Sequence, residues 1–130
     1  MAEIIRVKDV MHREVLSIDG MASAREAAAM MRSSQVAELL VTRRNDDDAW
    51  GIVTVMDIIK DVIVAERDAE TVFVYEIMTK PVITIPARMD IRYAIRLLDR
   101  IGARRAPVEE NGELVGMITL SSLIMDNDIL

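Results

Sequence analysis

The fold of this chain is decided by the stretch Gly51-Ile52-Val53-Thr54-Val55-Met56-Asp57. Its run of branched apolar residues predicts a short buried strand. The hydroxyl of Thr54, followed three residues later by the carboxylate of Asp57, predicts the start of a helix. The chain repeats this pattern in Gly116-Met117-Ile118-Thr119-Leu120-Ser121-Ser122, where Ser122 stands in place of the carboxylate. A strand-to-helix turn that occurs twice indicates one unit used twice.

The two copies align over most of the chain. A shift of 67 residues places Val7–Met11 on Val74–Met78, and the shift becomes 65 after the longer hairpin loop of the first copy. We therefore predict one repeat over 1–66 and a second over 67–130. Because one copy has too little apolar surface for a core of its own, we expect the sheets of both to pack together, with helices outside. A pseudo-twofold axis would then relate two clefts between the copies.

Each copy is predicted to run strand, helix, strand, strand, helix, which is an α+β fold. The predicted strands are Glu14–Ile18, Glu38–Thr42 and Trp50–Thr54 in the first copy, and Pro81–Ile85, Ala106–Val108 and Leu114–Thr119 in the second. The first long helix of each copy begins after a capping residue, Ser23 with Glu26 in one copy and Asp90 in the other. The closing helices are predicted from Met56 to about Ala65 and from Ser121 to about Asn127. The linker Glu66–Thr71 has no proline or glycine, so we expect it to stay partly helical.

Composition excludes several classes of protein. The net charge of −6 disfavours nucleic-acid binding, which needs a basic surface. No apolar run is long enough to span a bilayer, the N-terminus lacks a signal-peptide layout, and there is no cysteine, so we expect a cytoplasmic protein. His12 is the only histidine, and no serine, histidine and aspartate set or glycine-rich phosphate loop can be assembled. We therefore expect no enzyme, no catalytic cofactor and no metal site. The run Asp46-Asp47-Asp48 lacks the spacing of a calcium loop, which predicts a solvated loop.

The turn at Thr54 has two interpretations. In one, Thr54 caps the following helix and Asp57 returns a bond to it. In the other, the exposed N–H groups and the hydroxyl bind a phosphate, while the carboxylate accepts from the two adjacent hydroxyls of a ribose. Spacing alone leaves both interpretations open.

The arrangement of the whole chain resembles a tandem pair of CBS domains, the cystathionine-β-synthase-type module. The resemblance lies in the repeat order, the Val-Met opening, the Arg104–Val108 segment and the Gly-Ile-Val-Thr-x-x-Asp turn, and it extends from about Val7 to Met125. It implies a regulatory, non-catalytic Bateman module that binds an adenine nucleotide or a related adenosyl ligand in a cleft between repeats. The ligands implied are AMP, ADP, ATP, S-adenosylmethionine or NAD.

The resemblance also assigns site residues. It implies that Thr54 contacts phosphate and Asp57 contacts ribose, that Arg104 and Arg105 help to hold phosphates, and that Thr119 repeats the role of Thr54. Val82 and Ile83 would line the base pocket, although core packing explains them equally well. Ser122 departs from the pattern, since a neutral hydroxyl cannot accept two ribose bonds as a carboxylate does. The Asp57 cleft is therefore the one expected to bind.

Family analogy further implies a homodimer built through helices and a regulated protein partner. The alternative function is a structural or interaction module without a ligand, in which Thr54 and Asp57 form only a helix cap.

Overall fold

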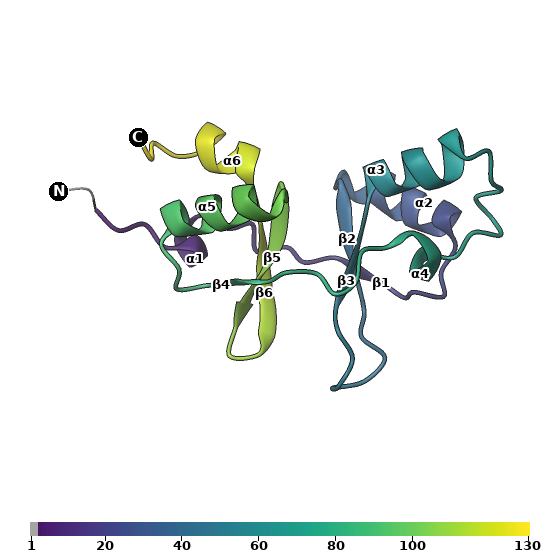
Figure 1. The fold of residues 1–130 in the computed structure, drawn as a ribbon, viewed down its shortest axis with the longest axis horizontal. Coiled ribbons are helices and arrows are strands. Elements are labelled where there is room, and N and C mark those ends of the chain that lie inside the picture. Colours follow the sequence, from purple (N-terminus) through teal and green to yellow (C-terminus); the bar gives the residue numbers. More distant parts are fainter. Residues whose placement is uncertain (1–2) are drawn as a thin grey trace. The chain divides into compact units, whose positions relative to one another are not determined.

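The computed structural model describes residues 3–130, which form two compact units (Figure 1). The central unit is Leu16–Val82, and the terminal unit combines the chain up to Val15 with Ile83–Leu130. Each unit contains a three-stranded mixed sheet together with helices, which confirms the predicted α+β class.

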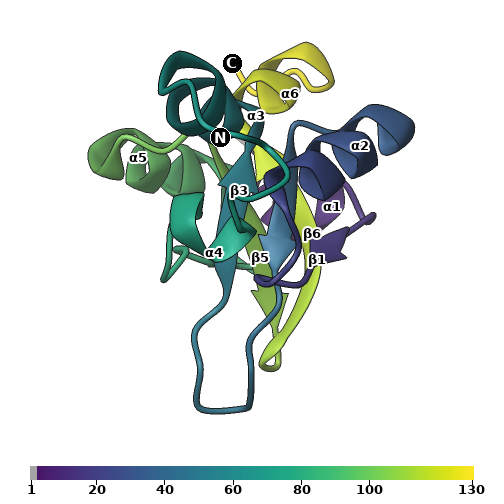
Figure 2. The same cartoon turned by 90° about the vertical axis from the view of Figure 1, so that its right-hand side faces the viewer.

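The central sheet has the order β1-β2-β3. Strand β1 (Ser17–Ile18) runs parallel to β2 (Glu38–Val41), which pairs antiparallel with β3 (Gly51–Thr54). Strand β1 is shorter than predicted because the chain passes from the terminal to the central unit at Val15, so only its last residues reach β2. The loop between β2 and β3 projects well beyond the sheet (Figure 2).

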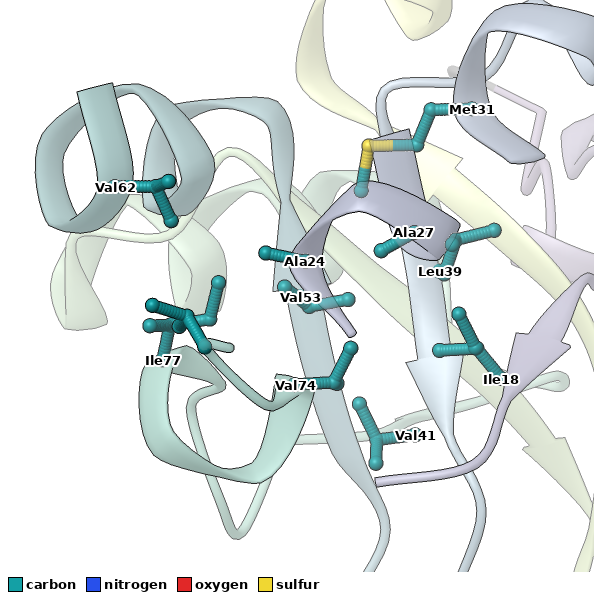
Figure 3. Packing of buried hydrophobic residues seen from close by; sticks show 11 residues of the cluster. Ile18, Ala24, Ala27, Met31, Leu39, Val41, Val53, Val62, Val74 and Ile77 are labelled. Atoms are coloured by element: carbon teal, nitrogen blue, oxygen red, sulfur yellow. The ribbon is translucent and has the colours of Figure 1, made fainter. Parts of the chain in front are cut away.

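Helix α2 (Ala24–Ser34) covers one face of this sheet (Figure 3). It begins with the predicted capping box: Ser23 Oγ accepts from the Glu26 N–H at 3.1 Å, and Glu26 Oε2 accepts from the Ser23 N–H at 3.3 Å. The buried side chains of α2 lie four residues or fewer apart, as one helical face requires. They pack on buried apolar residues of the strands, which include Ile18, Leu39, Val41 and Val53.

The closing helix of the central unit is less regular than predicted. Helix α3 (Val55–Ile58) continues into a π-helix, η1 (Ile59–Val64). Glu66 then takes a left-handed φ of 57°, and the Arg67 N–H closes onto the Val62 carbonyl at 2.9 Å. That reversal ends the helix, so the linker after it forms turns and the prediction of partial helix there was wrong.

The terminal unit repeats the plan. Its sheet has the order β4-β5-β6, with β4 and β5 parallel and β5 and β6 antiparallel. The elements are α1 (Val7–Val10), β4 (Ile85–Pro86), α5 (Ile91–Ile101), β5 (Arg105–Glu110), β6 (Glu113–Thr119) and α6 (Leu120–Met125). Asp90 caps α5 as predicted, since its Oδ1 accepts from the Arg92 N–H at 2.9 Å. Asn111 and Gly112 both have positive φ, as a tight hairpin turn requires.

The opening segment of each sequence repeat packs on the sheet of the other repeat. Helix α1 joins the terminal unit, where the Val7 N–H donates to the Met89 carbonyl at 2.8 Å. Helix α4 (Val74–Ile77) joins the central unit, where the Val74 N–H donates to the Ala22 carbonyl at 2.8 Å. The sequence repeats run one after the other, but the compact units exchange their first helices.

Two glycines lie where the exchanged segments contact the strands. A Cβ on Gly116 of β6 would lie 2.6 Å from the carbonyl oxygen of His12, which forms an antiparallel bridge with the next residue of that strand, Met117. A Cβ on Gly51 of β3 would meet the Met78 sulfur at 3.0 Å and the Thr79 carbonyl at 3.3 Å. The glycine that opens each repeated stretch therefore allows the exchanged segment to lie against the strand.

Candidate functional site

In the central unit, the turn from β3 to α3 brings Thr54 and Asp57 together. Thr54 Oγ1 accepts from the Asp57 N–H at 3.2 Å. Asp57 Oδ2 accepts from the Thr54 N–H at 2.8 Å and from the Thr54 hydroxyl at 3.1 Å. Both residues are partly buried. The capping interpretation is thus confirmed, and it fixes the orientation of the carboxylate.

In the terminal unit, the turn from β6 to α6 has the same geometry with a different group. The Ser122 N–H donates to Thr119 Oγ1 at 3.3 Å, so Thr119 caps α6 as Thr54 caps α3. The Thr119 hydroxyl donates to Ser122 Oγ at 2.8 Å, and the Ser122 hydroxyl donates to the Thr119 carbonyl at 3.0 Å. Both hydroxyl protons are therefore used within the turn, and the turn carries no charge of its own.

The two cations predicted for phosphate lie beside Thr119. Arg105 is the cross-strand partner of Thr119, and the Arg104 carbonyl accepts from the Leu120 N–H at 2.9 Å. In the central unit, Glu38 takes the position of Arg105, because it is the cross-strand partner of Thr54. Ala37 takes the position of Arg104, because its carbonyl accepts from the Val55 N–H at 3.0 Å. Within a unit, the carboxylate Asp57 therefore has an acidic neighbour, and the hydroxyl Ser122 has basic ones.

The two residues predicted for a base pocket lie where the chain leaves the central unit and re-enters the terminal one. Val82 is the last residue of the central unit, and its N–H donates to the Trp50 carbonyl at 2.9 Å. Ile83 begins the terminal unit and is 49% exposed. The partial burial of Val82 fits packing against its own unit.

Within residues 3–130, no group of three or more histidine, aspartate or glutamate side chains is placed to hold a metal ion. His12 is exposed, and it pairs through its backbone with Met117. No helix of the described chain is long and apolar enough to cross a membrane.

The prediction of a solvated loop is confirmed for Asp46 and Asp47, which are exposed, and is wrong for Asp48. Asp48, the last residue of the run expected to form a solvated loop, has a side chain only 10% exposed. Its Oδ2 accepts from Lys80 Nζ at 2.8 Å and from the Arg44 backbone N–H at 2.9 Å. These bonds hold the pKa of Asp48 well below its usual range, and the bond from Lys80 has the largest effect. Local sequence could not show this because Lys80 lies 32 residues further along the chain.

The sequence patterns also overlooked two cavities in the central unit. One, of about 480 Å³, lies between α2 and the α3–η1 segment and has mostly apolar walls that include Val36, Ile58 and Ile63. The other, of about 440 Å³, has cationic side chains in its wall, among them Arg43, Arg44 and Lys80. The signal for the second was the pair of arginines that begins two residues after β2, where the aligned positions of the other repeat are Glu110 and Asn111.

Comparison with known proteins gives a consistent family. The sequence profile of the CBS domain matches twice, over residues 7–64 and 74–126. An uncharacterised protein of Methanopyrus kandleri, MK0525, is 29% identical over 92% of this chain. A homoserine O-acetyltransferase of Methanocorpusculum labreanum is 35% identical over 90% of the chain. The chain spans 61% of the first relative's length and 23% of the second's.

A solved structure agrees with these matches. The hexameric CBS-CP12 protein of bloom-forming cyanobacteria is 32% identical, with a TM-score of 0.91 over 96% of this chain and 72% of that one. The repeat, the two mixed sheets and the capped strand-to-helix turns all accord with the profile matches. This chain belongs to the CBS domain family and carries two copies of the domain.

Proposed function

We propose that this CBS pair is a non-catalytic regulatory module that binds an adenine nucleotide or a related adenosyl ligand, with Asp57 as the ribose acceptor. The observation that carries the proposal is the state of the Asp57 carboxylate. All its hydrogen bonds within the described chain use Oδ2, and they hold the group in one orientation. Oδ1 remains for a ligand, and a carboxylate oxygen can accept from both hydroxyls of a ribose.

The remaining predicted contacts belong to the same proposal. Arg104 and Arg105 provide guanidinium groups suited to phosphate oxygens. The hydroxyls of Thr54 and Thr119 would have to turn from Asp57 and Ser122, to which they now donate, to reach a phosphate. Val82 and Ile83 provide apolar contact for a base. The candidate ligands are AMP, ADP, ATP, S-adenosylmethionine and NAD, because all of them contain adenosine.

A thermal-shift and calorimetric screen of these five ligands tests the proposal. A ligand present at about 100 times its dissociation constant should stabilise the folded protein by about 2.7 kcal/mol. At least one of the five should raise the melting temperature in a saturable way. Absence of any shift with all five at millimolar concentration would reject the proposal.

A second function, an interaction module without a ligand, is favoured by a different observation. The Thr54 and Asp57 cap is complete without any ligand, and η1 exposes the apolar side chains of Ile63 and Val64 by 66% and 71%. Exposed apolar side chains of this kind mark protein contacts. In this second function, the exposed apolar residues would contact another copy of the chain in a homodimer, or a regulated protein partner. Sedimentation of the wild type and of an Ile63→Lys, Val64→Lys variant tests it, since only the wild type should self-associate.

A further inference from the structure

A cavity at one edge of the central sheet combines positive charge with apolar walls. It has a volume of about 440 Å³, within the range of roughly 300–1,000 Å³ that small-molecule sites occupy. The parallel strands β1 and β2 both end at it, because Asp19 follows β1 and Thr42 follows β2. In open α/β sheets, ligands bind outside the carboxyl ends of the parallel strands, and this cavity has the same place relative to the parallel pair β1 and β2. Thr54 and Asp57 lie at the other end of β3, since Thr54 pairs with the first residue of β2.

Three cations line this cavity: Arg43, Arg44 and Lys80. Asp48 holds two of them together, since it accepts from Lys80 Nζ at 2.8 Å and from Arg44 Nε at 3.2 Å. The low pKa of Asp48 keeps this carboxylate ionised at neutral pH, so it offsets one positive charge. Nε is the only side-chain nitrogen of Arg44 with a hydrogen bond in the described chain, so its terminal nitrogens remain as donors.

Arg43 provides the third cation. Its guanidinium carbon lies 5.4 Å from the centre of the Trp50 ring, which is cation–π distance. Among the described residues its acidic contact is Asp46 at 3.8 Å, and that side chain is fully exposed, so water and salt screen the pair. The guanidinium of Arg43 makes no hydrogen bond within the described chain and can donate two parallel bonds to an anion.

One carboxylate also lines the cavity. Asp19 Oδ1 accepts from the Met21 N–H at 2.8 Å and so closes the turn after β1. With Asp19 and Asp48 both counted against three cations, the lining remains net positive. Apart from Thr42 and Gly20, the rest of the wall is apolar or aromatic and includes Val41, Met78 and the half-exposed Tyr75 ring.

The terminal unit provides the matched comparison. The cavity at the carboxyl ends of β4 and β5 has about half the volume, about 240 Å³. Its wall contains Glu109 and Glu110, where the central unit has Thr42 and Arg43. Arg88 is the one cation in that wall. At the carboxyl ends of the parallel strands, the central unit therefore has a larger cavity with a net positive wall, and the terminal unit has a smaller cavity with an acidic wall.

We propose that the central cavity is a second ligand site, which binds a small organic phosphate through Arg43, Arg44 and Lys80, with the ligand's apolar part against Tyr75 and Met78. Guanidinium pairs match phosphate oxygens, and a phosphomonoester carries about −1.5 to −2 charges near neutral pH. The site uses neither Asp57 nor Ser122 and does not rest on nucleotide binding.

Phenyl phosphate is a suitable probe, since it combines the anion with a flat apolar ring. Trp50 is the only tryptophan of the chain and lies against Arg43, so its fluorescence should change in a saturable way as the probe binds. Inorganic phosphate, which lacks the ring, and benzoate, which has a singly charged carboxylate in place of the phosphate, should each bind about tenfold more weakly. Calorimetry measures the same affinities without relying on Trp50.

Three variants test the assignment. Arg43→Gln with Arg44→Gln should weaken phenyl phosphate binding about tenfold or more. Arg44→Gln alone should weaken it severalfold, and this side chain is 82% exposed, so the variant should fold normally. Glu109→Gln with Glu110→Gln, at the matched cavity, should leave the affinity within about twofold.

Asp57→Ala separates this site from the proposed nucleotide site, because it should leave phenyl phosphate binding unchanged. The proposal is overturned if the wild type shows no saturable binding of the probe at millimolar concentration. It is equally overturned if the arginine variants bind as well as the wild type, or if the Glu109 and Glu110 variant loses as much affinity as they do.

Discussion

The turn at Thr54 and the turn at Thr119 are built alike and differ in chemistry. Each begins with a threonine whose hydroxyl accepts from the third residue of the helix. That third residue is the carboxylate Asp57 in one unit and the hydroxyl Ser122 in the other. The cross-strand neighbours are also opposite in charge, Glu38 against Arg105. Helix capping explains the shared threonine, but it does not require the two turns to differ in charge. We therefore connect the difference in charge between the turns with function.

The largest expected effect concerns the glycine that opens each stretch. Gly116→Ala places a Cβ 2.6 Å from the His12 carbonyl, so backbone must shift. Gly51→Ala mainly meets the end of the flexible Met78 side chain at 3.0 Å. We expect a loss in the free energy of unfolding of about 3 kcal/mol for Gly116→Ala and about 1 kcal/mol for Gly51→Ala. Urea denaturation measures both losses. Equal losses would show that the backbone packs equally tightly against both glycines, which would contradict this prediction.

Local features of this fold were predictable, and the exchanged segments were not. The caps at Ser23 and Asp90 were readable because a cap and its partner lie within three residues. The placement of α1 depends on contacts such as that between His12 and Met117, which lie far apart in sequence. The repeat showed that both copies begin alike, but it carries no information on which sheet each opening helix joins.

The candidate site was predictable to a similar extent. The pairing of Thr54 with Asp57 follows from spacing. The partner of Asp48 does not, because Lys80 reaches it from outside the hairpin, and only the folded chain brings that carboxylate and cation together.

A smaller effect should separate the two capping turns themselves. Asp57→Ala removes two bonds to the first residue of the turn, and we expect it to cost about 1 kcal/mol of unfolding free energy. Ser122→Ala removes only hydroxyl bonds in an uncharged turn and should cost about 0.5 kcal/mol. Thermal and urea unfolding check the order. A Ser122→Ala variant less stable than Asp57→Ala would contradict the comparison.

The pH dependence of stability should reveal the ion pair between Lys80 and Asp48 of the central unit. The pKa of Asp48 is lower in the folded protein than its ordinary value of about 3.9. Its contribution is therefore present above about pH 4 and is lost as the pH falls below that value. Asp48→Asn should destabilise the protein at pH 7 and should flatten the decline in stability below pH 4. Urea midpoints at pH 7 and pH 3 test this, and parallel pH profiles for both proteins would refute it.

An equally small effect on stability is expected from converting one turn toward the other. Ser122→Asp places a carboxylate where Asp57 has one, and it should change the unfolding free energy by only about 0.5 kcal/mol. If a carboxylate at this place is what a ribose requires, the variant should bind more adenosyl ligand per chain than the wild type. Calorimetric stoichiometry measures this, with Ser122→Asn as the uncharged control. An unchanged stoichiometry would mean that the charge alone does not create a site.

The central claim is that Asp57, and not Ser122, makes the ribose contact. Titration calorimetry of the wild type, Asp57→Ala and Ser122→Ala with the tightest ligand from the adenosyl screen tests it most directly. We expect Asp57→Ala to weaken binding about tenfold or more and Ser122→Ala to stay within about twofold of the wild type. Equal affinities for the wild type and Asp57→Ala, or equal losses in the two variants, would contradict it.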